Sequence, residues 1–438
     1  MITGLLTHGI GGREDLPIPF GYALAGAAFA VLVSFLAVGV VWRQSRLRGS
    51  AAGRQLPGWL ADLLDSAWLA WALRAAGLVL AGFTALALLF GKDLANNPAP
   101  GLIYVVFWVG LVPASLLLGP VWRRMNPLRT LHLLACLALR RSPERGLFAL
   151  PGWLGYWPAA FGLLAFTWLE LAAPDRATLP VLRTWLAGYL LLQLVGCLLF
   201  GSRWFDRADA FEAYSSLVAR LAPVGRRGDG RLVLRNPFDG LDSLRPAPGL
   251  TATVCVLLGS TAFDGLSGSI AWTNFAQDSG YPRALVATLG LLATVTLVSA
   301  VYTLATWACR PFSTVPAGEL PVAFAHSLVP IAVGYVVAHY FSMLLFEGQH
   351  TVILASDPLV TGANWFSTAE LGVDYQLVSP TTIANVQVLG VVVGHVLGVF
   401  AAHDRAVRIL RRSMVAQLPL LVAMVGFTVG GLTLLFAG

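Results

Sequence analysis

Charged side chains are scarce in this sequence, at 12% of the residues, whereas hydrophobic residues make up 57%. A chain with so few polar groups cannot cover a water-facing surface, and its mean hydropathy of +0.73 agrees with that. A soluble globular protein is therefore excluded. Because α-helices satisfy their own backbone hydrogen bonds in lipid, we expect an all-α bundle that crosses the lipid bilayer many times, with residues 1–438 forming a single transmembrane domain.

Cysteines are also few, and they form no motif. The four cysteines stand singly in or beside apolar segments, without any CxxC spacing. Neither a disulfide framework nor a zinc knuckle is indicated, and we interpret the thiols as packing groups. A basic stretch before the first apolar run is missing as well. We therefore expect the first span to stay in the mature protein rather than to be removed as a signal peptide.

The basic residues do not indicate binding to nucleic acid. The net charge is +7, but its arginines lie in short loops between apolar runs. In that position they are typical of orientation signals in a membrane protein. We therefore expect a multi-pass protein of the cell membrane with no nucleic-acid partner.

Apolar runs of about 20 residues, the length that crosses a bilayer, predict ten membrane spans. We expect them near residues 20–42, 72–90, 101–120, 152–173, 179–201, 249–263, 284–308, 320–346, 381–401 and 415–437.

Every second loop between these spans is basic, and this alternation predicts the orientation of the chain. Eight arginines lie in the loop 202–248, whereas the loop 347–380 has no lysine or arginine. Since cytoplasmic loops of membrane proteins are enriched in basic residues, we expect 202–248 in the cytoplasm. Both termini and the loop 347–380 are then extracytoplasmic.

Two stretches depart from a plain ten-helix bundle. The apolar run 250–263 is short of a full span before Asp264 and Gly265, which predicts a broken or re-entrant helix there. In the cytoplasmic loop, Phe211, Tyr214 and neighbouring apolar residues recur at helical spacing among charged residues. That pattern predicts a helix on the inner membrane surface, although a solvated connector would fit equally well.

Two histidines lie at matched depth toward the inner side. His326 and His395 each lie about seven residues from the inner end of their antiparallel spans. Neighbouring spans that are connected in sequence usually pack together, so the two imidazoles could approach each other. A hydrogen bond between helices and shared ligation of a haem b are the two interpretations of this pair.

A second polar layer lies toward the outside. His339 is 13 residues beyond His326, about 20 Å higher along the helix. His350, Glu347 and Asp264 fall at comparable depth, and the N-terminal segment adds His8. Imidazoles and carboxylates are the ligands that zinc and non-haem iron prefer, and a catalytic metal needs about three of them. No HExxH or similar spacing occurs, so structural hydrogen bonds remain an alternative.

Several stretches together resemble one family. They are HGIGGREDLPIPF at 8–20, AHSLVPIAVGYVVAHYFS at 325–342, LVSPTTIANVQV at 377–388, VVGHVLGVFAAHDRA at 392–406 and the terminal MVGFTVGGL. The chain is similar over its whole length to polytopic membrane proteins of high-GC Gram-positive bacteria that carry the name fenitrothion hydrolase. The resemblance implies a metal-assisted attack on a phosphotriester or a related ester.

Three functions follow from these patterns. The first is a membrane hydrolase that binds zinc or iron through His8, His339, His350 and Asp264. Asp264 or Glu347 is then the catalytic base, and an apolar substrate enters from the lipid. The second is a transporter for a metal or a small solute that uses both polar layers. The third is an electron carrier with a b-type haem between His326 and His395.

Overall fold

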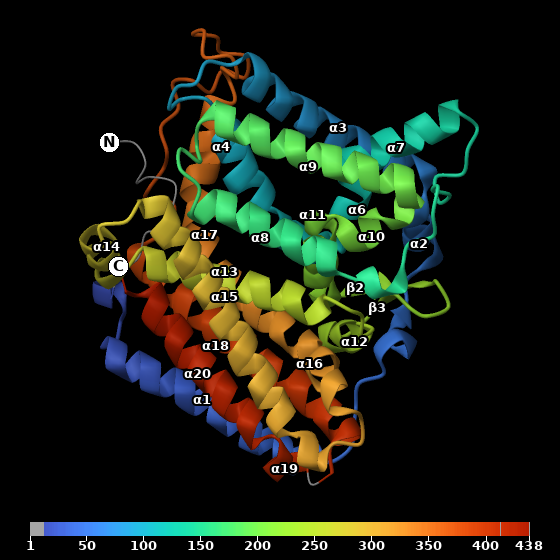
Figure 1. Cartoon of the computed structure of the whole chain (residues 1–438), viewed down its shortest axis with the longest axis vertical. Helices are drawn as coiled ribbons and strands as arrows, with labels where there is room; N and C mark the ends of the chain where they lie inside the picture. The colour runs from blue at the N-terminus through green and yellow to red at the C-terminus, as the bar shows by residue number, and fades with distance from the viewer. Residues whose placement is uncertain (1–12, 412, 438) are drawn as a thin grey trace.

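A computed structural model describes residues 13–411 and 413–437, which form a bundle of helices (Figure 1). The described part holds nine helices that are long and apolar enough to cross a membrane. The all-α, multi-pass class predicted from composition is therefore confirmed. These helices are α1 (Phe20–Val41), α3 (Ala67–Phe90), the composite Ala99–Leu118, α9 (Leu179–Phe200), α13 (Leu250–Ser267), α15 (Arg283–Ala308), the composite Ala317–Leu354, α18 (Pro380–Ile409) and α20 (Leu418–Leu435).

The tenth expected span, 152–173, is the shorter helix α8, which comprises the 15 residues Trp157–Leu171. Before α8, the backbone N–H of Tyr156 donates a hydrogen bond to the Pro248 carbonyl. After α8, the turn carries Arg176, whose carbonyl accepts from the Tyr104 hydroxyl.

At the two ends of the described chain, the Arg13 side chain donates to the Phe436 carbonyl at 2.7 Å. The first and last described segments therefore lie at the same end of the bundle.

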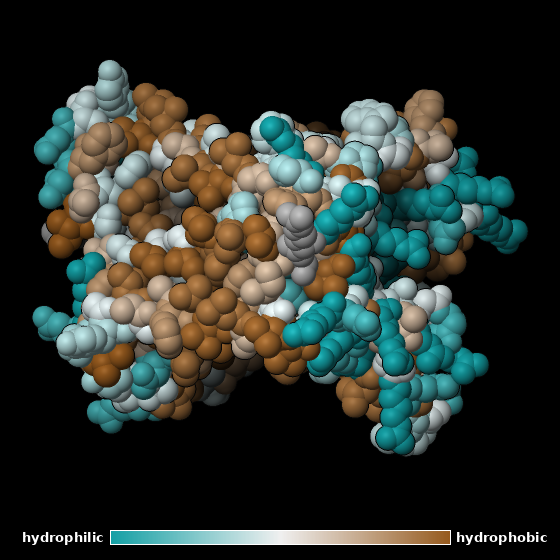
Figure 2. Space-filling view, turned by 90° about the horizontal axis from the view of Figure 1, so that it is seen from below, coloured by the Kyte–Doolittle hydropathy of each residue, from teal (hydrophilic) through white to brown (hydrophobic). Residues whose placement is uncertain are grey.

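Two helices occupy the centre of the bundle. We compared the most apolar 18-residue stretch of each spanning helix. In α13, and in the composite that ends in α17 (Leu328–Leu354), 72% of these residues are buried, whereas the share is 17–22% in α1, α3, α9 and α15. In Figure 2 the face seen from below is largely hydrophobic, and hydrophilic residues gather at the end where Figure 1 places β2 (Val224–Arg226) and α12 (Pro237–Asp242). Outer helices thus present apolar surface to lipid, while α13 and α17 form the core.

Glycines bring α17 and α18 into close contact. A Cβ atom added to Gly334 would lie 2.4 Å from the Gly390 carbonyl oxygen and 2.9 Å from the Gly394 Cα atom. Only hydrogen side chains allow the two backbones to approach so closely. The glycines Gly390, Gly394 and Gly398 therefore serve helix packing.

The prediction that the helix breaks at Asp264 is wrong. Helix α13 continues through this residue to Ser267, and the chain bends only at Gly268–Ser269 before α14 (Ile270–Asp278), where the Ser269 hydroxyl accepts from the Trp272 N–H. The Asp264 carboxylate accepts hydrogen bonds from α17. Because side chains of the neighbouring helix α17 donate hydrogen bonds to this carboxylate, the backbone of α13 remains helical at Asp264.

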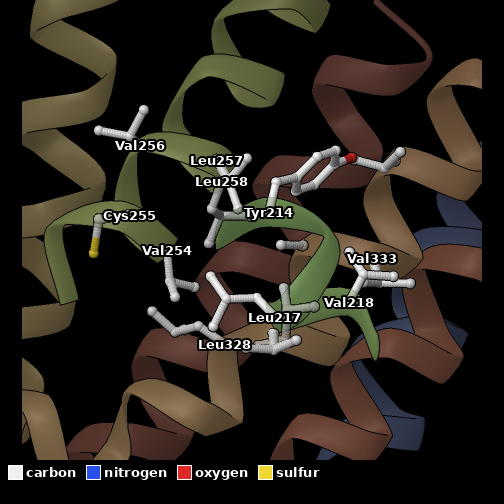
Figure 3. Packing of buried hydrophobic residues seen from close by; sticks show 14 of the residues in the cluster. Tyr214, Leu217, Val218, Val254, Cys255, Val256, Leu257, Leu258, Leu328 and Val333 are labelled. Atoms are coloured by element: carbon white, nitrogen blue, oxygen red, sulfur yellow. The ribbon is translucent and has the colours of Figure 1, made fainter. Parts of the chain in front are cut away.

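The expected helix in the loop 202–248 exists, but it does not lie on the membrane surface. Helix α11 (Ala210–Val218) enters the bundle, and Phe211, Glu212 and Tyr214 are all at most 4% exposed. Figure 3 shows Tyr214 and Leu217 packed near Val254 of α13 and Val333 of α17. A helix at a membrane surface would keep its polar face exposed, whereas α11 buries this face against Arg129 and Asn126.

The rest of the segment 202–248 forms a small cap at one end of the bundle. Here α10 (Phe205–Ala208) precedes α11, and α12 follows the strands. The antiparallel sheet has the order β1-β3-β2, with β1 at Arg54–Gln55 and β3 at Leu232–Leu234. Its register pairs Arg54 with Leu234 and Val224 with Leu234.

The loop expected at 347–380 begins later than the sequence suggested. Helix α17 runs to Leu354, so Glu347 and His350 lie on its last turns, and α18 begins at Pro380. The connecting loop therefore comprises residues 355–379.

Candidate functional site

The structure brings together Asp264 and His339, two residues of the expected outer site. The imidazole Nε2 atom of His339 donates to the Asp264 Oδ2 atom at 2.8 Å, and the Tyr340 hydroxyl donates to the same oxygen at 2.7 Å. Exposure is 2% for Asp264 and 6% for each of the other two residues. Two consecutive residues of α17 thus hold one buried carboxylate of α13.

His339 keeps one ring nitrogen free for chemistry. Its Nδ1 atom is buried and has no hydrogen-bond partner among the described residues. Because the carboxylate accepts from Nε2–H, the neutral imidazole carries its lone pair on Nδ1. The Tyr335 ring stacks on the imidazole, with centroids 6.1 Å apart, and the Tyr340 ring meets it edge-on at 4.8 Å. The geometry is that of an oriented histidine base.

A second carboxyl group lies beside this cluster. Glu170, near the C-terminal end of α8, lines a small cavity together with Asp264, Tyr340, Tyr104 and Arg176. The cavity has room for roughly one or two water molecules. Glu170 is 8% exposed, and its Oε2 atom has no hydrogen-bond partner in the described structure. Its depth in the sequence matches that of Asp264, which was the signal that could have assigned it to the site.

Tyr104 joins the cavity from an unusual backbone segment. It lies on η3 (Leu102–Val109), a π-helical stretch inside the third apolar helix. Its hydroxyl donates to the Arg176 carbonyl at 2.9 Å and so holds the turn after α8 against the cavity. π-Helical turns recur at functional sites of proteins. Sequence reasoning missed Tyr104 and Tyr340, since nothing in the pattern reveals where a phenol points.

The remaining expected metal ligands do not join this site. His350 and Glu347 pair with each other, at 3.4 Å between His350 Nδ1 and Glu347 Oε2, and the histidine is 47% exposed. His350 is 11 residues beyond His339, about 16 Å farther along α17. His8 lies outside the described residues. Expecting one ligand set from His339, His350 and Asp264 was therefore wrong, because the long helix separates the two histidines.

Within residues 13–411 and 413–437, no group of three or more His, Cys, Asp or Glu side chains is placed to hold a metal ion. A catalytic zinc or iron needs about three such ligands. The described residues thus do not form by themselves the metal centre that the family resemblance implied.

The two inner histidines have separate partners. His326 Nε2 donates to the Ala401 carbonyl of α18 at 3.2 Å, whereas His395 Nδ1 donates to the Val391 carbonyl of its own helix at 2.8 Å. A Cβ atom added to Gly394 would meet the Pro330 carbonyl, so His395 lies level with Pro330 rather than with His326. The two imidazoles therefore do not form the expected hydrogen bond with each other in the described structure.

A different polar cluster lies near the cap that contains α10, α12 and the small sheet. The Arg129 guanidinium donates to both carboxylate oxygens of Glu212, at 2.7 and 3.0 Å, and also to Asp206 at 2.9 Å. Asp209 accepts from Asn126 at 3.0 Å and from the Glu212 N–H at 2.8 Å, which caps α11. Burial raises the pKa of Glu212 to about 7, although Arg129 opposes the shift. These hydrogen bonds anchor α11 inside the bundle.

Comparisons with protein-family models, with curated proteins and with solved structures found no match. The geometry of the site is therefore the basis for assigning a function.

Proposed function

We propose that the chain crosses the bacterial cell membrane ten times and places both ends outside. The alternation of arginines between loops supports this orientation. The contact between Arg13 and Phe436 supports an even number of crossings, since both ends of the described chain lie together. Helix α8 is the tenth crossing, because it leads from the Pro248 side of the bundle to the turn at Arg176. Helices α11 and α13 pack against this short crossing.

We propose further that the protein is a proton-coupled transporter of a small solute. The observation that carries this proposal is the hydrogen bond between Asp264 and His339, buried in the outer half of two adjacent core helices. Ionisable groups within membrane spans are expensive to bury and commonly mark ion or proton routes. Asp264 and His339 can exchange a proton directly along their 2.8 Å hydrogen bond.

The size of the cavity favours protons over a bulky substrate. A space for roughly one or two water molecules cannot hold a phosphotriester, but it can complete a chain of hydrogen bonds. Glu170, Tyr104 and Tyr340 line this space and supply further groups that exchange protons.

Proton flux into proteoliposomes tests the proposal. A potassium diffusion potential drives protons inward, and a trapped pH-sensitive dye reports them. We expect Asp264→Asn and His339→Gln to reduce the flux at least tenfold. Asp278→Asn is the matched control, because Asp278 is an exposed carboxylate on α14. Wild-type flux in both site variants would overturn the proposal.

A hydrolase is the second candidate, and the free Nδ1 atom of His339 favours it. A carboxylate that orients one imidazole nitrogen leaves the other as a general base toward water, without any metal. The family resemblance points to phosphotriesters, which would reach the site from the lipid once a larger space opens beside it. Release of nitrophenol from a phosphotriester by purified protein, lost in His339→Gln, would select this function over transport. Zinc and iron content measured on the same sample would show whether a metal takes part.

A further inference from the structure

Three arginines of the cap have no ion-pair partner within 4 Å among the described residues. They are Arg207 on α10, Arg220 just after α11 and Arg235, which follows β3. In contrast, Arg129 pairs with Glu212 at 2.7 Å. All three arginines are half-buried. A guanidinium that is partly removed from water without a counter-charge is costly, so these side chains are candidates for binding an anion.

Arg220 and Arg235 reach neighbouring positions of α12. The Arg220 Nη1 atom donates to the Ser243 hydroxyl at 2.8 Å, and this hydroxyl donates to the Gly240 carbonyl at 2.6 Å. A Cβ atom added to Gly240 would lie 2.9 Å from the Arg235 Cζ atom, so the Arg235 guanidinium lies against this glycine. Residues three positions apart share one face of a helix. The two guanidinium groups therefore lie next to each other over the same face of α12.

Arg235 retains a donor that the protein does not use. Its Nε atom is buried and has no hydrogen-bond partner in the described structure. Burial lowers the pKa of the Arg235 guanidinium, the charge of Arg220 adds to this shift, and Asp239 opposes it. The Asp239 carboxylate itself accepts from the Arg48 N–H at 2.8 Å. Because arginine stays protonated, an anion with several oxygens would satisfy the Nε donor and relieve the repulsion between the two guanidinium groups.

Arg207 extends this pair toward the lipid-facing side of the bundle. Its guanidinium lies 4.4 Å from the centroid of the Tyr156 ring, directly before the first turn of α8. Burial lowers the pKa of Arg220, Tyr156 opposes this shift, and the charge of Arg207 adds to it. Trp153 and Phe161, on either side of Tyr156 in the sequence, are 72% and 65% exposed. Exposed aromatic side chains are typical of the level where lipid headgroups meet a membrane protein.

We propose that Arg207, Arg220 and Arg235 bind one phosphate group, supplied by the headgroup of an anionic phospholipid or by a soluble phosphate. Phosphate oxygens match the fork of N–H donors that a guanidinium presents. The exposed aromatic residues beside the arginines favour the headgroup as the source. A zwitterionic headgroup would bring a second positive charge close to the arginines, so an anionic phospholipid should bind more tightly.

The test is lipid binding to the purified full-length protein, followed by native mass spectrometry. Phosphatidylglycerol is the anionic probe, and phosphatidylcholine is the zwitterionic probe. We expect phosphatidylglycerol to bind at least tenfold more tightly, and its affinity to fall at least tenfold in the double variant Arg220→Gln/Arg235→Gln. Arg227→Gln is the matched control, because Asp229 already pairs with this arginine at 2.6 Å. It should bind both lipids as the wild type does.

Radioactive inorganic phosphate identifies the source of the phosphate group. Binding of this probe in phosphatidylcholine nanodiscs, without a preference for phosphatidylglycerol, would assign the site to a soluble phosphate. A preference for phosphatidylglycerol that inorganic phosphate does not abolish would assign it to the lipid.

Two results would overturn the proposal. One is a double variant that elutes as folded protein and binds phosphatidylglycerol and phosphate as the wild type does. Should the double variant fail to fold, the wild type decides, because equal binding of both lipids together with no bound phosphate also overturns the proposal. No step of this test measures proton flux, so its outcome leaves the proposed transport function unaffected.

Discussion

His339 and Asp264 are 75 positions apart in the chain, yet a hydrogen bond of 2.8 Å joins them in the core of the bundle. This contact ties α17 to α13, the two central helices. It explains why α13 passes through a charged residue without a break, because the neighbouring helix supplies the donors that lipid cannot. The same contact makes Asp264 both a structural and a chemical residue, and its substitutions should separate the two roles.

Asp264→Asn and Asp264→Ala should differ in stability. Asparagine keeps an acceptor oxygen for His339 and Tyr340, whereas alanine leaves two buried donors unpaired. We expect alanine to lower the free energy of unfolding by about 3 kcal/mol and asparagine by less than half of that. Thermal unfolding followed by fluorescence size-exclusion chromatography measures both. Equal losses would mean that the two donors find other partners.

The inner histidines should act independently on stability. His326 and His395 donate to different carbonyls, those of Ala401 and Val391, and no hydrogen bond joins the two described rings. We expect the effects of His326→Ala and His395→Ala on the free energy of unfolding to add within about 0.5 kcal/mol. The double variant measured against both single variants completes the cycle. A large coupling energy would instead place the two rings in one network.

Stability should depend on pH through the cluster that anchors α11. Burial raises the pKa of Glu212 from 4.5 to about 7, with Asp209 and Asp206 adding to the shift and Arg129 opposing it. The folded state then binds the proton more tightly than the unfolded state does. Its contribution to stability is present below about pH 4.5 and is lost as the pH rises through about 7.

The pH profile of the melting temperature measures this loss, and Glu212→Gln should flatten the profile between those values. Glu144→Gln serves as the control, since its carboxylate is 70% exposed. A wild-type profile that rises over the same interval would show that Arg129 keeps Glu212 ionised.

Single introduced cysteines should report the orientation of the loops. Gly372 and Ser142 are both exposed, and the arginine pattern places the first outside and the second inside. In a chain without its native cysteines, we expect an impermeant thiol reagent to label Gly372→Cys in intact cells and Ser142→Cys only after permeabilisation. The reverse pattern would invert the topology. Ser356 is unsuitable for this purpose, because it is 1% exposed and hydrogen-bonded to Asn364.

The fold class and the proximity of Asp264 to His339 could be predicted from the sequence. Composition requires membrane helices, and counting depth along the spans placed Asp264 and His339 at one level, where the structure joins them. The depth of a residue along its helix does not reveal which neighbour its side chain faces. For this reason Tyr340 was missed, and the pairing of His326 with His395 was wrong. Helix α11 was misplaced for a related reason.

The charged face of α11 indicates an interfacial helix as long as its partners are unknown. Glu212 is satisfied by Arg129, which lies 83 residues earlier in the chain, and only the folded structure reveals such a partner. Buried polar groups are therefore harder to place from the sequence than apolar spans, because their burial depends on distant residues.

The packing of α17 on α18 gives the last prediction. A methyl group on Gly334 would lie 2.4 Å from the Gly390 carbonyl oxygen, which is backbone and cannot turn away. Gly334→Ala should therefore push the helices apart and lower the free energy of unfolding by roughly 1–3 kcal/mol. Gly426→Ala on α20 is the matched control, because no heavy atom lies within 4 Å of the added carbon. In that control the change favours the helix slightly, by up to about 1 kcal/mol. Since α17 also carries His339 and Tyr340, separation of the two helices should reduce proton flux together with stability. If Gly334→Ala were as stable as Gly426→Ala, the two helices would pack less closely than the distances between their backbones indicate.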